Sequence, residues 1–182
     1  MSLNVQVNAS LKPFNSFGVD VTASLFAQAH TDADVREALL YAADRKLPLL
    51  VIGGGSNLLL TGNVTALVLR MASRGIRLLE DDGERVVVEA EAGEVWHAFV
   101  LWTLEQGLSG LENLSLIPGT VGAAPMQNIG AYGVEIKDVF AGLTALDRQT
   151  GELRDFTLAE CNFGYRDSLF KQQAGRWLIL RV

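Results

Sequence analysis

The sequence predicts an α+β fold in two lobes, a small α/β lobe over residues 1–74 and a larger lobe with a mainly antiparallel sheet over residues 75–182. The first third alternates a helical pattern with short apolar runs. The remaining two thirds contain alternating strand patterns separated by turn residues. The pattern changes near residues 71–75, and we place the boundary between the lobes there.

The composition is that of a folded domain. The chain has 182 residues, of which 49% are hydrophobic and 20% charged, and its formal net charge is −6. Lys and Arg form no basic stripe, so no nucleic acid partner is expected. No run of about 20 apolar residues exists, so no membrane partner is expected either.

The single cysteine and the N-terminal sequence indicate a cytoplasmic protein. Cys161 excludes an internal disulfide framework and suits a reducing compartment. The first residues have no basic segment leading into an apolar stretch, so no secretory signal is visible. With only His30 and His97 as further soft ligands, no metal site is expected.

The first lobe is expected to contain one helix and several strands. Residues 31–34, Thr-Asp-Ala-Asp, resemble a capping box, and apolar residues then recur at close to helical spacing. Pro48 ends the predicted helix. The apolar run 49–52 is typical of a buried parallel strand, and the runs 58–60 and 66–69 are expected to be further strands.

The second lobe is expected to contain four strands and one helix. The predicted strands cover residues 85–91, 143–148, 152–156 and 177–182. The helix is expected over residues 94–106, with Gly107 ending it. Because natural domains seldom stop in mid-strand, we expect the chain to be a fragment of a longer protein.

A first glycine-rich loop, Gly53-Gly54-Gly55-Ser56-Asn57, follows a predicted buried strand. It matches neither standard phosphate motif, since Leu58 replaces the third glycine of the dinucleotide fingerprint and no lysine follows as in a P-loop. Its consecutive N–H groups still suit a diphosphate. In that case a Cβ at Gly54 or Gly55 would collide with the ligand or force a disfavoured φ, and Gly55→Val would weaken binding while the fold is largely kept. The alternative is a tight turn that needs a positive φ, which a lone triple glycine favours.

A second glycine-rich segment covers residues 117–133. Small residues over 119–124 would let a flat ring lie against the backbone, and a short helical turn there would direct N–H groups to an anion. Gln127 and Asn128 suit the donor and acceptor edge of a heterocycle. The alternative is an ordered connecting loop, but seventeen such residues without regular structure are uncommon unless functional.

A third cluster, Phe163-Gly164-Tyr165-Arg166-Asp167-Ser168, places a guanidinium beside a phenol and a carboxylate. Arg166 could present its fixed charge to a substrate carboxylate or a developing enolate. The commoner alternative for a lone arginine is a structural ion pair. His97 and Cys161 are expected to be packed residues. No Gly-x-Ser-x-Gly elbow exists, which argues against a serine hydrolase.

Six motifs, in this order, resemble the UDP-N-acetylenolpyruvoylglucosamine reductase family, the flavoproteins of bacterial peptidoglycan precursor synthesis. They are Asn15-Ser16-Phe17-Gly18, residues 53–58, Gly110-Leu111-Glu112-Asn113-Leu114, Ile117-Pro118-Gly119, residues 125–133 and Gly164-Tyr165-Arg166-Asp167-Ser168. The resemblance runs from about residue 12 to the last residue. It implies the FAD-binding fold of vanillyl-alcohol oxidase and p-cresol methylhydroxylase, with FAD between a small α/β lobe and a larger lobe.

The resemblance also implies a set of cofactor-binding residues. FAD is expected to be bound without a covalent bond, because neither glycine-rich segment contains His or Cys. Many members carry serine where this chain has Ala123 and Ala124, so hydroxyl contacts from those positions are not expected. The implied FAD-binding residues are Gly53, Gly54, Gly55, Ser56, Asn57, Leu58, Ile117, Pro118, Gly119, Gly122, Ala123, Ala124, Gln127, Asn128, Gly130, Ala131, Tyr132 and Gly133.

In that family, NADPH reduces the FAD, and UDP-N-acetylglucosamine enolpyruvate then accepts the hydride and a proton to give UDP-N-acetylmuramate. The resemblance implies that Arg166 is catalytic and stabilises the enolate with a glutamate, and that Tyr165 and Arg166 bind substrate. The glutamate and a serine acid belong to a C-terminal substrate-binding domain that this chain lacks. We therefore expect FAD binding without turnover.

Two other classes of protein remain as alternatives. One is a different FAD-dependent oxidase or dehydrogenase of the same fold, against which residues 165–168 and the missing flavin-linking histidine argue. The other is a non-catalytic nucleotide-binding module, which would be colourless and indifferent to FAD.

Overall fold

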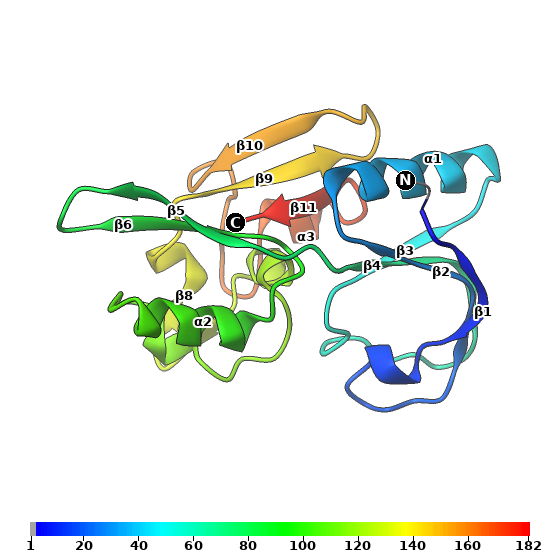
Figure 1. Cartoon of the computed structure of the whole chain (residues 1–182), viewed down its shortest axis with the longest axis horizontal. Coiled ribbons are helices and arrows are strands. Elements are labelled where there is room, and N and C mark those ends of the chain that lie inside the picture. Colours follow the sequence, from blue (N-terminus) through cyan, green and yellow to red (C-terminus); the bar gives the residue numbers. More distant parts are fainter. Residues whose placement is uncertain (1–2) are drawn as a thin grey trace. The chain divides into compact units, whose positions relative to one another are not determined.

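The computed structural model describes residues 3–182, and the chain divides into two compact units (Figure 1). One unit ends at Ser73 and the other begins at Arg74. The helices within residues 3–182 are all too short or too polar to cross a membrane.

The first unit is built on a four-stranded sheet with the order β1-β2-β4-β3. Strand β1 is antiparallel to β2, whereas β2 and β3 both run parallel to β4. The strands are β1 (Gln6–Ser10), β2 (Thr22–Ala29), β3 (Leu49–Ile52) and β4 (Val64–Met71), and a short 3₁₀ helix, η1 (Lys12–Phe14), follows β1. The predicted strands over 49–52 and 66–69 are therefore confirmed.

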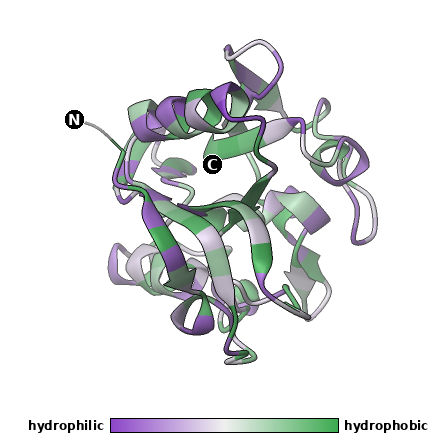
Figure 2. Cartoon of the chain, turned by 90° about the vertical axis from the view of Figure 1, so that its right-hand side faces the viewer, coloured by the Kyte–Doolittle hydropathy of each residue, from purple (hydrophilic) through white to green (hydrophobic). Residues whose placement is uncertain are grey.

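Helix α1 (Asp32–Asp44) connects β2 to β3 and packs against β2 (Figure 1). The predicted capping box is confirmed, because the Thr31 hydroxyl accepts from the Asp34 N–H and the Asp34 carboxylate accepts from the Thr31 N–H. Hydrophobic and hydrophilic residues alternate along the helix in Figure 2, and its buried residues are Val35, Ala38 and Ala42.

The predicted strand over 58–60 is wrong, since these residues form no regular structure. Strand β4 already has β2 on one side and β3 on the other. The segment does not pair with the edge strands β1 and β3 either, and Leu60 packs into the core while Leu59 is exposed. An apolar run predicts that some of its residues are buried, and Leu60 is buried here without being part of a strand.

The sheets of the second unit are antiparallel, as the sequence predicts. Strands β5 (Ile76–Asp81) and β6 (Val86–Ala90) form a hairpin, and β10 (Leu153–Thr157), β9 (Gly142–Asp147) and β11 (Trp177–Arg181) form a sheet in that order. Ala90 and Val182 exchange two backbone hydrogen bonds, which join β6 to the end of β11.

Helix α2 (Trp96–Glu105) confirms the predicted helix, and Gly107 follows it with a φ of 75°. A second helix, α3 (Leu169–Gln172), is a single turn. Between α2 and β9 lie the 3₁₀ helices η2 (Glu112–Leu114), η3 (Val121–Ala123), η4 (Pro125–Gln127) and η5 (Ile136–Asp138) and the small hairpin of β7 (Gly130–Ala131) and β8 (Val134–Glu135).

Candidate functional site

The first glycine-rich loop begins directly after β3, at the carboxyl end of a parallel strand. Among the described residues, no acceptor pairs with the N–H groups of Gly53, Gly54, Gly55 and Ser56. Backbone donors are strong hydrogen-bonding groups, and a consecutive run of them without protein partners is typical of an anion-binding loop. The observed loop fits the diphosphate of a nucleotide cofactor.

Gly55 has a second role, which lies within the protein itself. Its φ is 65°, and a Cβ built on it would lie 2.0 Å from the Phe14 carbonyl oxygen. The Ser16 N–H donates to the Gly55 carbonyl at 3.1 Å. The predicted alternative of a disfavoured φ is therefore confirmed at Gly55, and the expectation that Gly55→Val largely keeps the fold is wrong, because the side chain would first meet residues 14 and 15.

Asn15 fixes the segment that crosses Gly55. Its amide nitrogen donates to the carbonyls of Leu11 (2.8 Å) and Val19 (3.0 Å), and its amide oxygen accepts from the Val19 N–H at 2.9 Å. The side chain is buried. Asn15 belongs to the first of the six sequence motifs, but no sequence pattern indicates this role, which only the contacts in the structure show.

The second glycine-rich segment is tied into the protein by its own backbone. The Val121 N–H donates to the Glu94 carbonyl, the Gly122 N–H to Ala92 and the Ala123 N–H to Thr120. A short helical turn is confirmed as η3, whose own N–H groups donate within the protein, whereas the N–H groups of Gly119 and Thr120 just before it have no acceptor among the described residues. A Cβ at Gly122 would lie 2.5 Å from the Ala92 Cβ, so this glycine permits close packing.

The other predicted cofactor-binding residues of this segment differ in exposure. Ile117, Gly119, Gln127, Gly130 and Ala131 are half-buried, Ala124 and Asn128 are buried, and Pro118, Ala123, Tyr132 and Gly133 are exposed. In the first loop, Gly54 and Asn57 are exposed, whereas Gly53, Ser56 and Leu58 are half-buried.

Tyr132 stands at the turn of the β7–β8 hairpin. Tyr132 and Gly133 both have positive φ, 51° and 81°, as a tight two-residue hairpin turn requires. The tyrosine side chain is 89% exposed. A non-glycine residue held in this conformation with its ring in solvent is typical of a functional position.

Arg166 lies in a second tight turn. Gly164 and Asp167 exchange two backbone hydrogen bonds, and Arg166 between them has a φ of 53°. Its side chain is exposed and makes no ion pair or hydrogen bond to residues 3–182, while the neighbouring Tyr165 is 88% exposed. The alternative of a structural ion pair within the described chain is not observed, and the guanidinium is presented to solvent.

Asp167 does not pair with Arg166. The Gln172 amide donates to its carboxylate at 2.8 Å. This hydrogen bond is the main cause that lowers the pKa of Asp167 from its ordinary value. The positive charge of Arg166 is therefore available to a ligand.

Cys161 is a packed core residue, as expected, and His97 accepts a hydrogen bond from the backbone. The His97 Nδ1 accepts from the Leu116 N–H at 3.2 Å. Cys161 is fully buried, and burial raises the pKa of its thiol to about 12. Within residues 3–182, no three His, Cys, Asp or Glu side chains gather as metal ligands would.

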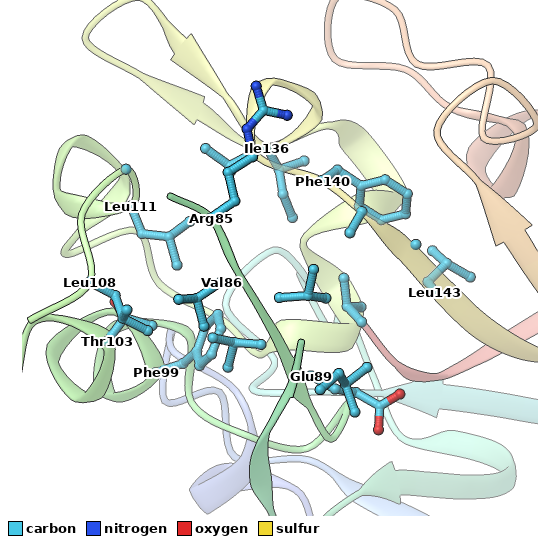
Figure 3. Close-up of a pocket in the computed structure, with 18 of the residues that line it drawn as sticks. Arg85, Val86, Glu89, Phe99, Thr103, Leu108, Leu111, Ile136, Phe140 and Leu143 are labelled. Carbon is cyan, nitrogen blue, oxygen red and sulfur yellow. The ribbon is translucent and has the colours of Figure 1, made fainter. Parts of the chain in front are cut away.

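A groove of about 1300 Å³ lies within the second unit (Figure 3). Its wall includes Val86 of β6, Phe99 of α2, Ile136 of η5 and Leu143 of β9. None of the predicted cofactor-binding or substrate-binding residues lines it.

Comparison with known proteins identifies the class of protein to which a chain with this fold and this first glycine-rich loop belongs. The family model described as "FAD binding domain" matches residues 23–157. The chain belongs to this FAD binding domain family.

Within that class, the chain is similar to one kind of reductase. It is 81% identical over 182 residues to the UDP-N-acetylenolpyruvoylglucosamine reductase of Pseudomonas fluorescens strain Pf-5, covering all of this chain and 54% of that protein. This chain thus spans about half the length of the relatives it matches.

Two solved structures support the predicted fold class. The UDP-N-acetylenolpyruvylglucosamine reductase from Thermus caldophilus gives a TM-score of 0.76 at 26% identity, over 100% of this chain and 61% of the other. Substrate-bound p-cresol methylhydroxylase gives a TM-score of 0.65 at 16% identity. The match covers 98% of this chain and 39% of the other. The α+β FAD-binding fold is confirmed.

Proposed function

We propose that this chain binds FAD without a covalent bond and is the FAD-binding part of a longer NADPH-dependent reductase. The observation that carries the proposal is the loop of four successive N–H groups, Gly53 to Ser56, which lack acceptors among the described residues. These groups would hold the diphosphate of FAD without a formal positive charge. Exposed residues of the second glycine-rich segment, such as Tyr132 and Gly133, would lie beside the flavin.

The substrate of the longer protein is UDP-N-acetylglucosamine enolpyruvate, and its product is UDP-N-acetylmuramate, a peptidoglycan precursor. Support comes from the reductases that match this chain along its full length. When bound, FAD would supply hydride chemistry, carrying a hydride from NADPH to the vinyl terminus of the substrate. The adjacent carbon then takes a proton.

Arg166 stabilises the negative charge that develops when the hydride arrives. A carboxylate-bearing enolate needs a fixed cation at hydrogen-bonding distance, and the Arg166 guanidinium has no ion-pair partner among residues 3–182. Tyr165, exposed at the same turn, contacts the substrate. The general acid and a partner glutamate come from the C-terminal domain of the longer protein, which this chain does not include.

The cofactor proposal is tested on the purified 182-residue chain. After incubation with FAD and removal of the excess, the protein should be yellow, and acid precipitation should release all of the colour into the supernatant. Flavin that stays in the pellet contradicts non-covalent binding. A colourless protein that ignores added FAD contradicts the proposal as a whole.

The catalytic proposal is tested by comparing this chain with the full-length protein. With NADPH and the enolpyruvyl substrate, the full-length protein should form UDP-N-acetylmuramate and the 182-residue chain should form none that is detectable. Loss of a general acid alone lowers a rate by about 10²–10⁴-fold, and loss of substrate positioning adds to this. Product formation by the short chain at rates near those of the full-length protein would falsify this assignment of roles.

A further inference from the structure

The buried side chain of Asn128 connects the second glycine-rich segment to the turn that carries Arg166. Its amide nitrogen donates to the Gly164 carbonyl at 2.9 Å, and its amide oxygen accepts from the Lys137 N–H at 3.3 Å. The residue is fully buried and has a φ of 45°. Because both ends of the amide serve the protein, the orientation of this side chain is determined by its partners.

Ser168 makes the same connection from the other side of the turn. Its hydroxyl donates to the Met126 carbonyl at 2.7 Å and accepts from the Lys171 N–H at 3.3 Å. The residue is fully buried. Residues 126 and 128 are thereby joined to residues 168 and 164, one on each side of Arg166.

The turn between these two anchors holds Arg166 in a conformation that it would not adopt freely. A left-handed backbone is disfavoured for a non-glycine residue, and Arg166 has a φ of 53°. The Lys171 ammonium also donates to the Arg166 carbonyl at 2.6 Å. The backbone at position 166 is therefore fixed while the guanidinium is exposed.

We propose that Asn128 and Ser168 are positioning residues, which hold the Arg166 turn against residues 126–128 so that the guanidinium meets the enolate of the substrate. The inference rests on the proposed function and extends it to two residues that need touch neither substrate nor FAD with their side chains. Asn128 was predicted to contact a heterocycle, and its buried amide instead acts through Arg166.

Two variants at position 128 and one at position 168 test the proposal in the full-length protein. Asn128→Asp keeps the shape of the side chain and the oxygen that accepts from the Lys137 N–H. It replaces the amide nitrogen with an oxygen, which then faces the Gly164 carbonyl and cannot donate to it. Glu135 also lies beside this amide, so an aspartate at position 128 would bring its charge close to that of Glu135. Asn128→Gly is therefore the second variant, because it removes the donor without adding a charge and without a penalty for the left-handed backbone. Ser168→Ala removes the bond to Met126.

Thr103→Val is the matched control. The Thr103 hydroxyl is also buried and also donates to a backbone carbonyl, that of Val100 at 2.8 Å, but it lies in α2. Loss of this hydroxyl should leave the rate of flavin reduction by NADPH and the rate of flavin reoxidation by the substrate unchanged.

The two half-reactions separate positioning from a general loss of structure. In the position 128 and 168 variants, NADPH should bleach the flavin absorbance at the rate seen without the substitution, and FAD affinity should be unchanged. Recovery of the absorbance on adding the enolpyruvyl substrate should slow by about 10- to 100-fold, as misplacement of a catalytic group by about 1 Å produces. Equal slowing of both half-reactions would indicate a merely structural role and overturn the proposal.

A double-mutant cycle shows whether the effect passes through Arg166. In an Arg166→Ala background, Asn128→Asp should cause no further slowing of the recovery, because the group that it positions is gone. Full additivity of the two substitutions overturns the positioning role but leaves the proposed function intact. If the unsubstituted full-length protein never transfers hydride to this substrate, the proposed function fails instead.

Backbone dynamics give a readout that needs no turnover. NMR relaxation should report an order parameter for the Arg166 amide near 0.85 in the unsubstituted protein and below about 0.6 in the position 128 and 168 variants. The Thr103→Val control should resemble the unsubstituted protein. An Arg166 amide that stays rigid in all three variants overturns the proposal.

Discussion

The two glycine-rich segments have similar compositions but use their small residues differently. In the loop of residues 53–56, the successive N–H groups have no acceptor among the described residues. In residues 121–124, each N–H donates to a carbonyl of the protein. The N–H groups of residues 53–56 are therefore available to a ligand, whereas those of residues 121–124 stabilise the protein itself.

The comparison shows that small residues can serve three separate needs. Gly122 allows close packing on Ala92, and Gly55 allows both a positive φ and a close approach to Phe14. Gly54 is exposed, and its N–H has no acceptor among the described residues. Glycine content alone does not distinguish these cases, because each of them requires the absence of a side chain.

The largest expected effect comes from Gly55→Ala. The added Cβ would lie 2.0 Å from the Phe14 carbonyl oxygen on a residue with a φ of 65°. Overpacking and the left-handed backbone together should lower the free energy of unfolding by about 2–4 kcal/mol, measured by urea denaturation. Gly62→Ala is the control, since nothing lies within 4 Å of its Cβ, and its effect should stay within about 0.5 kcal/mol. Equal stability of the two variants would mean that Gly55 has no structural role.

Gly122→Ala should have the next largest effect. Its Cβ would lie 2.5 Å from the Ala92 Cβ and 3.0 Å from the Ala92 Cα, so the free energy of unfolding should fall by about 1–3 kcal/mol. Ala123→Ser, at the exposed neighbouring position, should change it by less than about 0.5 kcal/mol. If Gly122→Ala weakens FAD binding with no change in denaturation, the contrast between the two segments is wrong.

Gly54→Val should affect the ligand and spare the fold. Gly54 is exposed, so a side chain there would meet the diphosphate before it meets the protein. FAD affinity should fall at least tenfold, which is about 1.4 kcal/mol, in a fluorescence titration, with urea denaturation unchanged. Gly62→Val serves as the control for both measurements. An unchanged affinity would contradict ligand binding by the first loop and favour the alternative that it is only a tight turn.

Elements with a strong local cause were predictable from the sequence. The Thr31–Asp34 capping box, the strand over 49–52 and the glycine that ends α2 all depend on neighbours in the sequence. The absence of a strand over residues 58–60 was not predictable, because strand pairing depends on segments distant in the sequence, and this segment joins neither edge strand of the sheet.

The candidate site was predictable as a set of residue types but not as a set of contacts. The sequence indicates the triple glycine and the arginine cluster as candidates. Within residues 3–182, the structure shows N–H groups without acceptors in the first and a guanidinium without an ion-pair partner in the second. The bonds of Asn128 to Gly164 and of Ser168 to Met126 join residues 36 and 42 positions apart. No local pattern encodes such pairs.

Amide hydrogen exchange of this chain with and without FAD tests the central claim most directly, that the N–H groups of residues 53–56 hold the cofactor. On binding, exchange at Gly53, Gly54, Gly55 and Ser56 should slow at least tenfold, because these donors gain acceptors. The amides of residues 121–124, which already have acceptors, should be slow from the start and change little. FAD binding that leaves the 53–56 amides exchanging as fast as before would contradict the account.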